Sequence, residues 1–340
     1  MKLEIQGKNK LSELEVFSGI AILYVVLIHC NSYYLLNILN LQAYENAYFY
    51  IRLLDNFVHA AVPMFIFISG YKYALNNINE DYKKYVSKRI KKVLKPFLII
   101  STIFFINYVI KNPNEYKGIS NIIIGFINIF MGYNIAFQLW YIPMYIFIVC
   151  TYPIIYIKFK TDKNRMIFIL VILLLQYLLG INIDRLSMYP FSFVYYYLFF
   201  EMGVMFCKYN LKSKIEKNCI SIIIIYISSV IVLSFNFIPG LYIFFQTYLL
   251  YPLSVVAYYV LSLKLINIKV LNFLGKYSFY IFLLHEPIIG TKISYLFNKI
   301  GIYNSMIYVF ISCILTIMVT FIVYKVIQHT FINKILFNVK

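Results

Sequence analysis

Long apolar runs separated by short polar connections constrain this chain more than any other feature. An α-helix needs roughly 20 apolar residues to cross about 30 Å of hydrocarbon, and the chain supplies ten stretches of about that length. It is 62% hydrophobic and 13% charged, whereas soluble domains are about half apolar and a quarter charged. We therefore predict an all-α, polytopic membrane protein of about ten transmembrane helices, forming a single domain over residues 1–340.

The predicted spans alternate with connections of very different charge. Their ranges are 16–37, 56–76, 94–111, 136–158, 166–183, 189–207, 219–237, 240–263, 274–291 and 303–328. The formal net charge of +18 comes mostly from every second connection, beginning with the block Lys83–Lys95. Cytoplasmic loops of membrane proteins carry such an excess of Lys and Arg. The pattern predicts that both termini are cytoplasmic, and it indicates a lipid bilayer rather than nucleic acid as the partner.

One apolar segment, Ile119–Met131, does not fit the series of spans. It has about 13 residues, which is short for a crossing. Counting it as a span would also place the basic residues Lys158–Arg165 on the outer side. We therefore expect a re-entrant or interfacial helix there.

Ionisable residues inside predicted spans are the first candidates for function, because charge at bilayer depth is costly. His29 lies about thirteen residues into the first span, or roughly 20 Å from its inner end. His285 and Glu286 lie at a similar depth in the ninth span, and Glu201 lies within the sixth. A carboxylate there protonates or finds a partner. Both a histidine and a tyrosine are open as the partner of Glu201.

Two further groups lie near the ends of predicted spans. Asp55 and His59 share one helix face where the second span begins, and we expect a solvated rim there. The basic residues after this span have a helical spacing, which indicates either a positive-inside collar or an anion site for a phosphorylated cytosolic cofactor. The five cysteines show no paired spacing, so we expect no disulfide framework and no metal.

Five separated segments resemble the membrane acyltransferase-3 family, the bacterial O-acyltransferases that modify cell-surface sugars. The resemblance covers nearly the whole chain, and its segments occur in the family's order. They are Leu14–His29, Val62–Tyr71 with its Pro and Ser-Gly, Lys88-Arg89 through Pro96, Leu139–Pro143, and Leu274–His285.

The resemblance implies transfer of an acyl group, usually acetyl, from cytosolic acyl-CoA to a hydroxyl of a cell-surface or lipid-linked glycan. His29 matches the family's essential histidine, which can act as a general base or carry the acyl group itself. With His29 we expect Glu201 and His285 to be catalytic. The residues expected to hold the acetyl-CoA or other acyl-CoA donor are Ser18, Lys88, Arg89, Lys92 and Trp140.

Two positions depart from the family pattern. The family usually has an arginine eleven residues before its histidine, where this chain has Ser18. Eleven residues make close to three helical turns, so both positions share a helix face about 16 Å apart. Lys88, Arg89 and Lys92 are the obvious substitutes for holding the CoA phosphates. Gln138 stands where many members have a histidine, which bears on activity or acceptor type.

Two other interpretations stay open at this point. One is a transporter or flippase of a glycan or small solute, although the inverted repeats common in that class are not evident. The other is a degenerate, sensor-like member of the family, which Ser18 favours. Under the leading interpretation the chain is a multi-pass protein of the bacterial cytoplasmic membrane, and a homodimer is an option.

Overall fold

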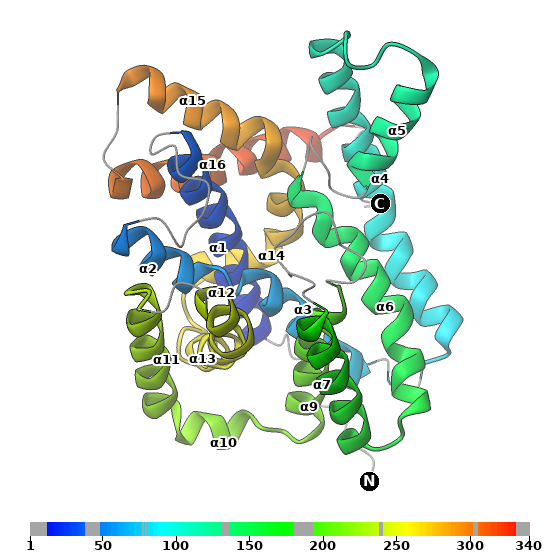
Figure 1. The fold of residues 1–340 in the computed structure, drawn as a ribbon, viewed down its shortest axis with the longest axis vertical. Coiled ribbons are helices and arrows are strands. Elements are labelled where there is room, and N and C mark those ends of the chain that lie inside the picture. Colours follow the sequence, from blue (N-terminus) through cyan, green and yellow to red (C-terminus); the bar gives the residue numbers. More distant parts are fainter. Residues whose placement is uncertain are drawn as a thin grey trace.

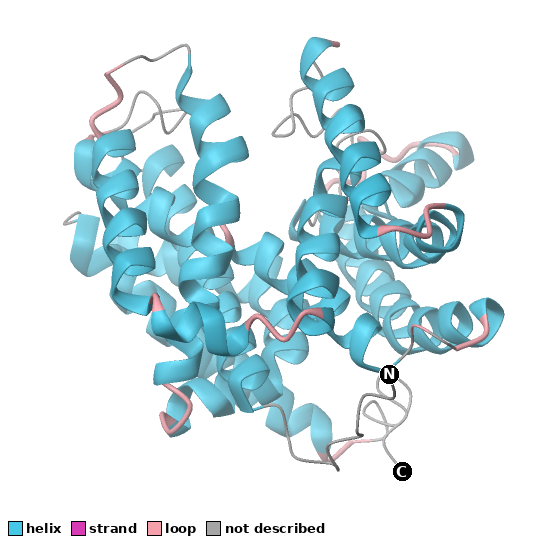
Figure 2. Cartoon of the chain, turned by 90° about the horizontal axis from the view of Figure 1, so that it is seen from below, coloured by secondary structure: helices cyan, strands magenta, loops and turns pink. Residues whose placement is uncertain are grey.

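The computed structural model is built from helices in all the parts of the chain that it describes. These parts are residues 12–37, 48–76, 78, 80–130, 137–179, 193–237, 241–301 and 305–330. Figure 2 shows helices joined by short loops, with no strand among these residues. The predicted all-α class is confirmed for these parts of the chain.

The amino-terminal half contains α1 with α2 and α3 packed against it, and a second group in which α4 packs with α5 and α6 (Figure 1). An Asp81 side chain caps the longest of them, α4, by accepting a hydrogen bond from the Lys84 backbone N–H. The bounds are α1 (Ser12–Asn37), α2 (Phe49–Val58), α3 (Ala61–Asn76), α4 (Tyr82–Lys111), α5 (Ile119–Phe130), η2 (Phe137–Trp140), α6 (Tyr141–Lys158) and α7 (Asp162–Leu178).

The carboxyl-terminal half is more often interrupted. Two single π-type turns, η6 and η7, break the helical hydrogen bonding there, and such turns are frequent at functional sites. The bounds are η4 (Phe193–Tyr196), α9 (Tyr197–Lys208), α10 (Lys212–Lys217), α11 (Cys219–Ser234), α12 (Tyr242–Phe245), η6 (Gln246–Leu250), α13 (Tyr251–Lys264), α14 (Lys269–Leu284), η7 (His285–Ile289), α15 (Gly290–Ile300) and α16 (Ser305–Gln328).

Six helical stretches of the described chain are long and apolar enough to cross a bilayer. Four other predicted spans coincide with shorter helices: α7, α9, α11 and α14. The outer ends of two of these spans, 180–183 and 189–192, lie outside the described residues. The chain is thus a membrane protein, while the count of ten spans stays a prediction. The six stretches are Ser12–Leu36, Phe49–Asn76, Tyr82–Lys111, Gln138–Lys158, Tyr242–Lys264 and Ile307–Gln328.

The segment expected to be re-entrant or interfacial forms the short helix α5. Its 12 residues span about 18 Å at 1.5 Å per residue, well short of the hydrocarbon thickness. The helix packs on α4, where the rings of Phe105 and Phe126 have their centroids 5.5 Å apart. Its isoleucines at 119, 123 and 127 are exposed. Its position relative to the bilayer stays a prediction.

Helix α1 lies in the middle of the bundle and packs against α3, α13, α14 and α16 (Figure 1). The crossing with α14 is close because a glycine of each helix faces the other. A Cβ added at Gly19 would lie 2.0 Å from the carbonyl oxygen of Leu271, and one at Gly275 would lie 1.8 Å from that of Glu15. Small residues at helix crossings let backbones approach in this way.

A second glycine pair joins α3 to α9. A Cβ at Gly70 would meet the Phe200 carbonyl oxygen at 2.0 Å, and one at Gly203 would meet that of Phe67 at 2.1 Å. The Ser-Gly of the segment Val62–Tyr71 is therefore a packing feature. It draws α3 and α9 together and holds the wall of aromatic side chains that they share.

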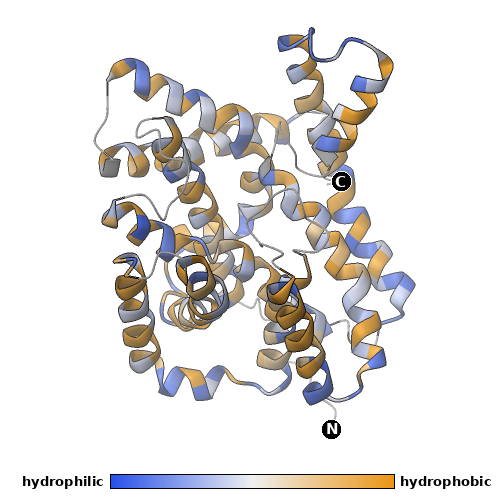
Figure 3. Cartoon of the chain, viewed as in Figure 1, coloured by the Kyte–Doolittle hydropathy of each residue, from blue (hydrophilic) through white to orange (hydrophobic). Residues whose placement is uncertain are grey.

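The outward faces of the bundle are apolar, as a bilayer requires. Figure 3 shows hydrophobic colouring along α7 and α11, while hydrophilic residues concentrate in the connecting helix α10. Helices α11 and α16 expose isoleucine and valine side chains, among them Ile224, Val232 and Ile322. These faces would be costly in water and suit contact with lipid chains.

Candidate active site

Two histidines from distant parts of the chain meet inside the bundle. The ring centroids of His29 on α1 and His285 at the end of α14 are 5.2 Å apart, and the rings are inclined by 56°. His285 is fully buried, whereas His29 is only partly buried. The sequence predicted a similar depth for both residues, and the packing of α1 against α14 brings them together.

The contacts of His285 define its protonation. Its Nδ1 lies 2.9 Å from the carbonyl oxygens of both Ile281 and Phe282. Carbonyl oxygens only accept hydrogen bonds, so Nδ1 carries a proton, and in the neutral ring Nε2 carries the lone pair. Nε2 is buried and has no hydrogen-bond partner among the described residues. A buried acceptor of this kind favours an N–H or O–H donor beside it.

The helix is broken directly after His285, and other helices hold the break. Glu286 has extended backbone angles (φ −131°, ψ 158°) inside η7. Gln138 donates its Nε2–H to the Glu286 carbonyl oxygen at 2.7 Å, and the Tyr33 hydroxyl donates to Glu286 Oε2 at 2.9 Å. Gln138, noted above as a departure from the family pattern, therefore anchors the turn that presents His285.

A basic cavity lies along the same two helices. Its volume is about 560 Å³, and it is bounded mainly by α1, α3, α4, α6 and α14. Four cationic side chains line it, against one carboxylate, Glu15. The described lining residues are Leu14, Glu15, Ser18, Phe65, Ile68, Ser69, Lys72, Arg89, Lys92, Val93, Tyr141, Ile142, Tyr145, Gly275, Lys276, Ser278, Phe279, Tyr280 and Phe282.

Three of the five residues expected to hold the donor line this basic cavity: Ser18, Arg89 and Lys92. Ser18 Oγ donates to Ser278 Oγ at 2.9 Å, linking α1 to α14. The other two are elsewhere. Lys88 is two-thirds exposed and lies 3.9 Å from a carboxylate oxygen of Glu80, and Trp140 packs against the ring of Tyr196.

Two cations of the basic cavity, Lys72 and Lys276, were missed in the sequence. Each follows a glycine-containing segment, Ser-Gly-Tyr-Lys in α3 and Leu-Gly-Lys in α14. Both belong to predicted spans near their inner ends. A lysine at that depth is a signal in itself, because it must reach the interface or a polar cavity.

The basic cavity reaches up toward the two histidines. Phe282 lines the cavity, and its ring centroid is 6.2 Å from that of His285. On α1, Ser18 and His29 are eleven residues apart, about 16 Å along the axis. The histidines thus lie at one end of the α1–α14 pair and the cationic side chains toward the other.

Glu201 belongs to a different cluster of side chains from the two histidines. Its carboxylate accepts hydrogen bonds from the Tyr152 hydroxyl and from Arg165, whose Nε lies 3.2 Å from Oε2. Arg165 and Glu201 are both completely buried. Of the two partners considered for Glu201, the structure contains the tyrosine and adds an arginine. Arg165 was assigned to a basic connection in the sequence, which concealed this pairing.

Asp55 is buried, so the expectation of a solvated rim is wrong for this residue. Its Oδ1 lies 2.8 Å from His59 Nδ1, and its Oδ2 accepts a hydrogen bond from Gln246 Nε2 at 2.9 Å. The His59 ring stacks on Tyr251 and keeps about a third of its side chain exposed. His59 follows the last residue of α2, a helix that packs against α1, which carries His29.

The described residues form a helical membrane bundle in which a histidine pair lies at one end of two helices and a cationic cavity toward the other, and such a cavity suits the binding of an anionic group. Residues 11–325 match the acyltransferase-3 family, described as an acyltransferase domain, and the chain belongs to this family. No curated protein and no solved structure matches it. Among the described residues, no group of three or more His, Cys, Asp or Glu side chains is placed to hold a metal ion.

Proposed function

We propose that the protein is an O-acyltransferase of the bacterial cytoplasmic membrane. It moves an acyl group, acetyl in the simplest case, from cytosolic acyl-CoA to a hydroxyl of a cell-surface or lipid-linked glycan. It does so as one unit of about ten spans over residues 1–340, with both ends cytoplasmic. The observation that carries the proposal is the basic cavity, which leads along α1 and α14 toward His29 and His285.

The donor occupies the basic cavity. Acyl-CoA carries a pyrophosphate and a further phosphate on its nucleotide, and the cavity offers Lys72, Arg89, Lys92 and Lys276. The planar guanidinium of Arg89 suits a two-pronged hydrogen bond to a phosphate, and the lysines add positive charge. Together they supply the charge that an arginine at position 18 provides in the usual family pattern. The positive-inside bias supports a cytosolic position for this end of the bundle.

His29 acts as the general base. Its neutral imidazole takes the proton of the acceptor hydroxyl while the hydroxyl oxygen attacks the thioester carbonyl carbon. The new C–O bond forms, the C–S bond breaks, and the departing thiolate takes the proton from His29. The lone pair of His285 Nε2, held toward the interior by the Nδ1 bonds, favours an N–H of His29 as its donor and so orients that ring. Transfer through an acyl-histidine is the alternative chemistry.

No step is assigned to Glu201. Its carboxylate is neutralised by Arg165 and bonded to Tyr152. Buried ion pairs of this kind hold packed elements in one arrangement. We therefore propose a structural role, in which Glu201 and Arg165 tie α9 to α7.

The test uses three purified forms of the chain, labelled acetyl-CoA as donor and a long-chain glycolipid as the hydroxyl acceptor. Wild type should bind the donor and consume its thioester, and His29→Ala should bind it with turnover reduced about 100-fold or more. His329→Ala is the matched control, because His329 is exposed and follows the last helix. Turnover that survives in His29→Ala at full expression contradicts the general-base role. Binding without turnover in wild type indicates the sensor-like interpretation, and no binding favours transport.

A further inference from the structure

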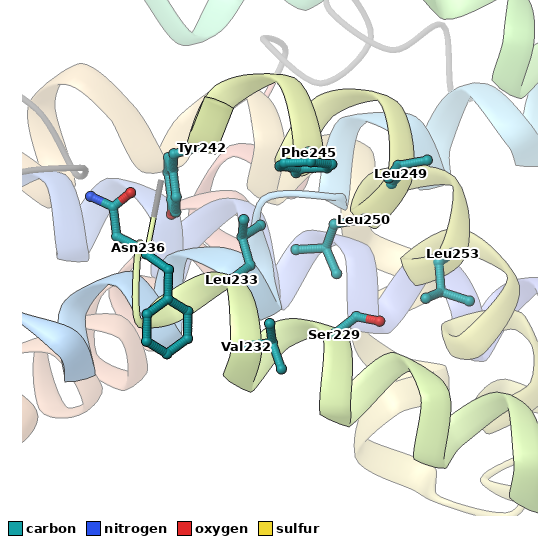
Figure 4. Close-up of a pocket in the computed structure, with 10 residues that line it drawn as sticks. Ser229, Val232, Leu233, Asn236, Tyr242, Phe245, Leu249, Leu250 and Leu253 are labelled. Atoms are coloured by element: carbon teal, nitrogen blue, oxygen red, sulfur yellow. The ribbon is translucent and has the colours of Figure 1, made fainter. Parts of the chain in front are cut away.

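An apolar groove lies apart from the basic cavity, between α11 on one side and α12, η6 and α13 on the other (Figure 4). Its volume is about 330 Å³, within the usual range for small-ligand pockets of about 300–1,000 Å³. Its lining is mostly aliphatic and aromatic. The described lining residues are Ser229, Val232, Leu233, Asn236, Phe237, Tyr242, Phe245, Leu249, Leu250 and Leu253.

The groove lies at the end of its helices that is remote from the basic residues. α11 follows the lysine-rich helix α10, and the groove begins about ten residues later, at Ser229. On the other side, the groove is lined by α12, η6 and the first turn of α13, whereas the basic residue Lys264 lies at the far end of α13. Under the positive-inside orientation these basic ends are cytosolic. The groove therefore lies in the outer half of the bilayer, with its polar residues Asn236 and Tyr242 toward the outer surface.

The groove is open to the lipid. Val232, Phe237 and Leu249 are more than half exposed although they are large and apolar. They lie on the outside of the bundle, while Tyr242 and Leu250 are buried and form the back wall. Figure 4 shows the side chains of both sides converging on one space. At this depth the medium that surrounds the opening is hydrocarbon, so a hydrocarbon chain can enter sideways.

Behind the wall of the groove a chain of hydrogen bonds leads toward the histidines. The Tyr242 hydroxyl donates to Asn56 Oδ1 at 3.1 Å. Gln246, one turn further, donates to both Asn56 and Asp55. Asp55 holds the ring of His59 at the end of α2, and α2 packs against α1, the helix that carries His29. These contacts link the lipid-facing groove to His59, beside the helix that carries the proposed catalytic base.

We propose that this groove binds the hydrocarbon tail of an amphiphilic acceptor, with the hydroxylated head group at the partly exposed ring of His59, next to the helix that carries His29. The inference rests on the proposed function and deepens it, since it assigns a membrane-anchored acceptor and the site of its tail. A soluble sugar needs no apolar groove. A bulk phospholipid needs no groove that is backed by a polar network beside the helix of the proposed base.

The first experiment is independent of catalysis. Protein in nanodiscs is labelled with a glycolipid whose tail carries a photoreactive diazirine, and the labelled peptides are mapped. We expect labelling within 229–237 and 242–253 that an excess of unlabelled glycolipid suppresses and an equal excess of phospholipid does not. Labelling suppressed equally by both lipids shows annular lipid only and overturns the proposal, as does labelling elsewhere.

Two variants locate the site. Leu249→Trp fills the groove from a side chain already exposed to lipid, so the fold has room for it. Ile231→Trp is the matched control, because Ile231 is an exposed α11 residue outside the groove. We expect the competed labelling to fall about tenfold in Leu249→Trp and to be unchanged in Ile231→Trp. Equal labelling in both variants overturns the proposal.

The second experiment measures acyl transfer to two acceptors with the same sugar head, a long-chain glycolipid and its methyl glycoside. Leu249→Trp should lose transfer to the glycolipid while keeping both donor binding and transfer to the methyl glycoside. Loss of both transfers, or of neither, overturns the proposal. If wild type neither binds nor consumes the donor, the proposed function fails, and the photolabelling result still decides whether the groove holds the tail.

Discussion

At the scale of single residues, the site depends on which of several similar side chains face inward. Arg89 and Lys88 are neighbours in one basic block, and the sequence assigned both to the donor. Arg89 lines the basic cavity, whereas Lys88 points to Glu80 and is largely exposed. A helix turns about 100° per residue, so two adjacent residues need not face the same cavity. Which of the two faces inward depends on how α4 is rotated.

This pair provides a sharp test of the donor site. Arg89→Ala should raise the KM for acyl-CoA about tenfold, because a charge-assisted phosphate contact of about 1.4 kcal/mol is lost. kcat should change less, since the residue is remote from His29. Lys88→Ala is the control and should leave KM nearly unchanged. Steady-state kinetics with varied donor separates the two, and equal effects would show that the basic block acts only as a surface collar.

At the scale of elements, the crossing of α1 and α14 positions the histidines. Gly19 and Gly275 bring the two backbones into contact, and His29 and His285 lie at corresponding heights further along the pair. The sequence contained both glycines within the segments that resemble the family. The sequence could not show that each glycine faces the other, because this depends on the relative rotation and height of two helices about 250 residues apart.

Gly19→Ala tests this crossing. The added Cβ would lie 2.0 Å from a backbone oxygen of Leu271, which cannot move without shifting α14. Overpacking of this kind costs about 1–3 kcal/mol. We expect a lower thermal unfolding midpoint in detergent together with a loss of turnover larger than the loss of donor binding. Ser221→Ala, at an exposed position of α11, should behave as wild type. A Gly19→Ala protein with unchanged stability and turnover would mean that the helices do not cross here.

The buried pair of Arg165 and Glu201 is a second element-scale feature. Arg165→Met leaves the Glu201 carboxylate buried without its cation, and breaking such a pair costs about 3–5 kcal/mol. We expect a marked drop in the unfolding midpoint. The double variant Arg165→Met with Glu201→Gln should recover part of it, because the uncompensated charge is gone. Lys264→Met, which breaks an exposed pair with Glu216, should have little effect. No recovery in the double variant would argue that packing, rather than charge, holds α7 to α9.

At the scale of the whole molecule, the distribution of charge predicts the orientation in the membrane. Single cysteines at Lys117, Lys88 and Lys214 test it against a membrane-impermeant maleimide, with the unmodified chain as the background for its own five cysteines. Lys117→Cys should react in intact cells, because it lies in a predicted outer connection. The other two should react only after permeabilisation. Reaction of Lys214→Cys in intact cells would contradict the count of ten spans.

The features that depend on neighbouring residues could be predicted from the sequence alone. Apolar runs of sufficient length predicted helices and a bilayer, the lysine blocks predicted an orientation, and the segment around His29 indicated the family and its reaction. These signals are carried by neighbouring residues and the fixed rise of a helix, so they can be read without knowing how the helices pack.

The contacts between distant residues became evident only from the folded chain. It placed His285 beside His29, added Lys72 and Lys276 to the basic cavity, and paired Glu201 with Arg165 instead of a histidine. It also buried Asp55, which the sequence had placed at a solvated rim. Lipid chains are as apolar as leucine, so burial from water does not choose among helix partners in a membrane. Close packing and hydrogen bonding between helices determine which helices pair. The pattern of residues along the chain does not show these contacts between distant segments.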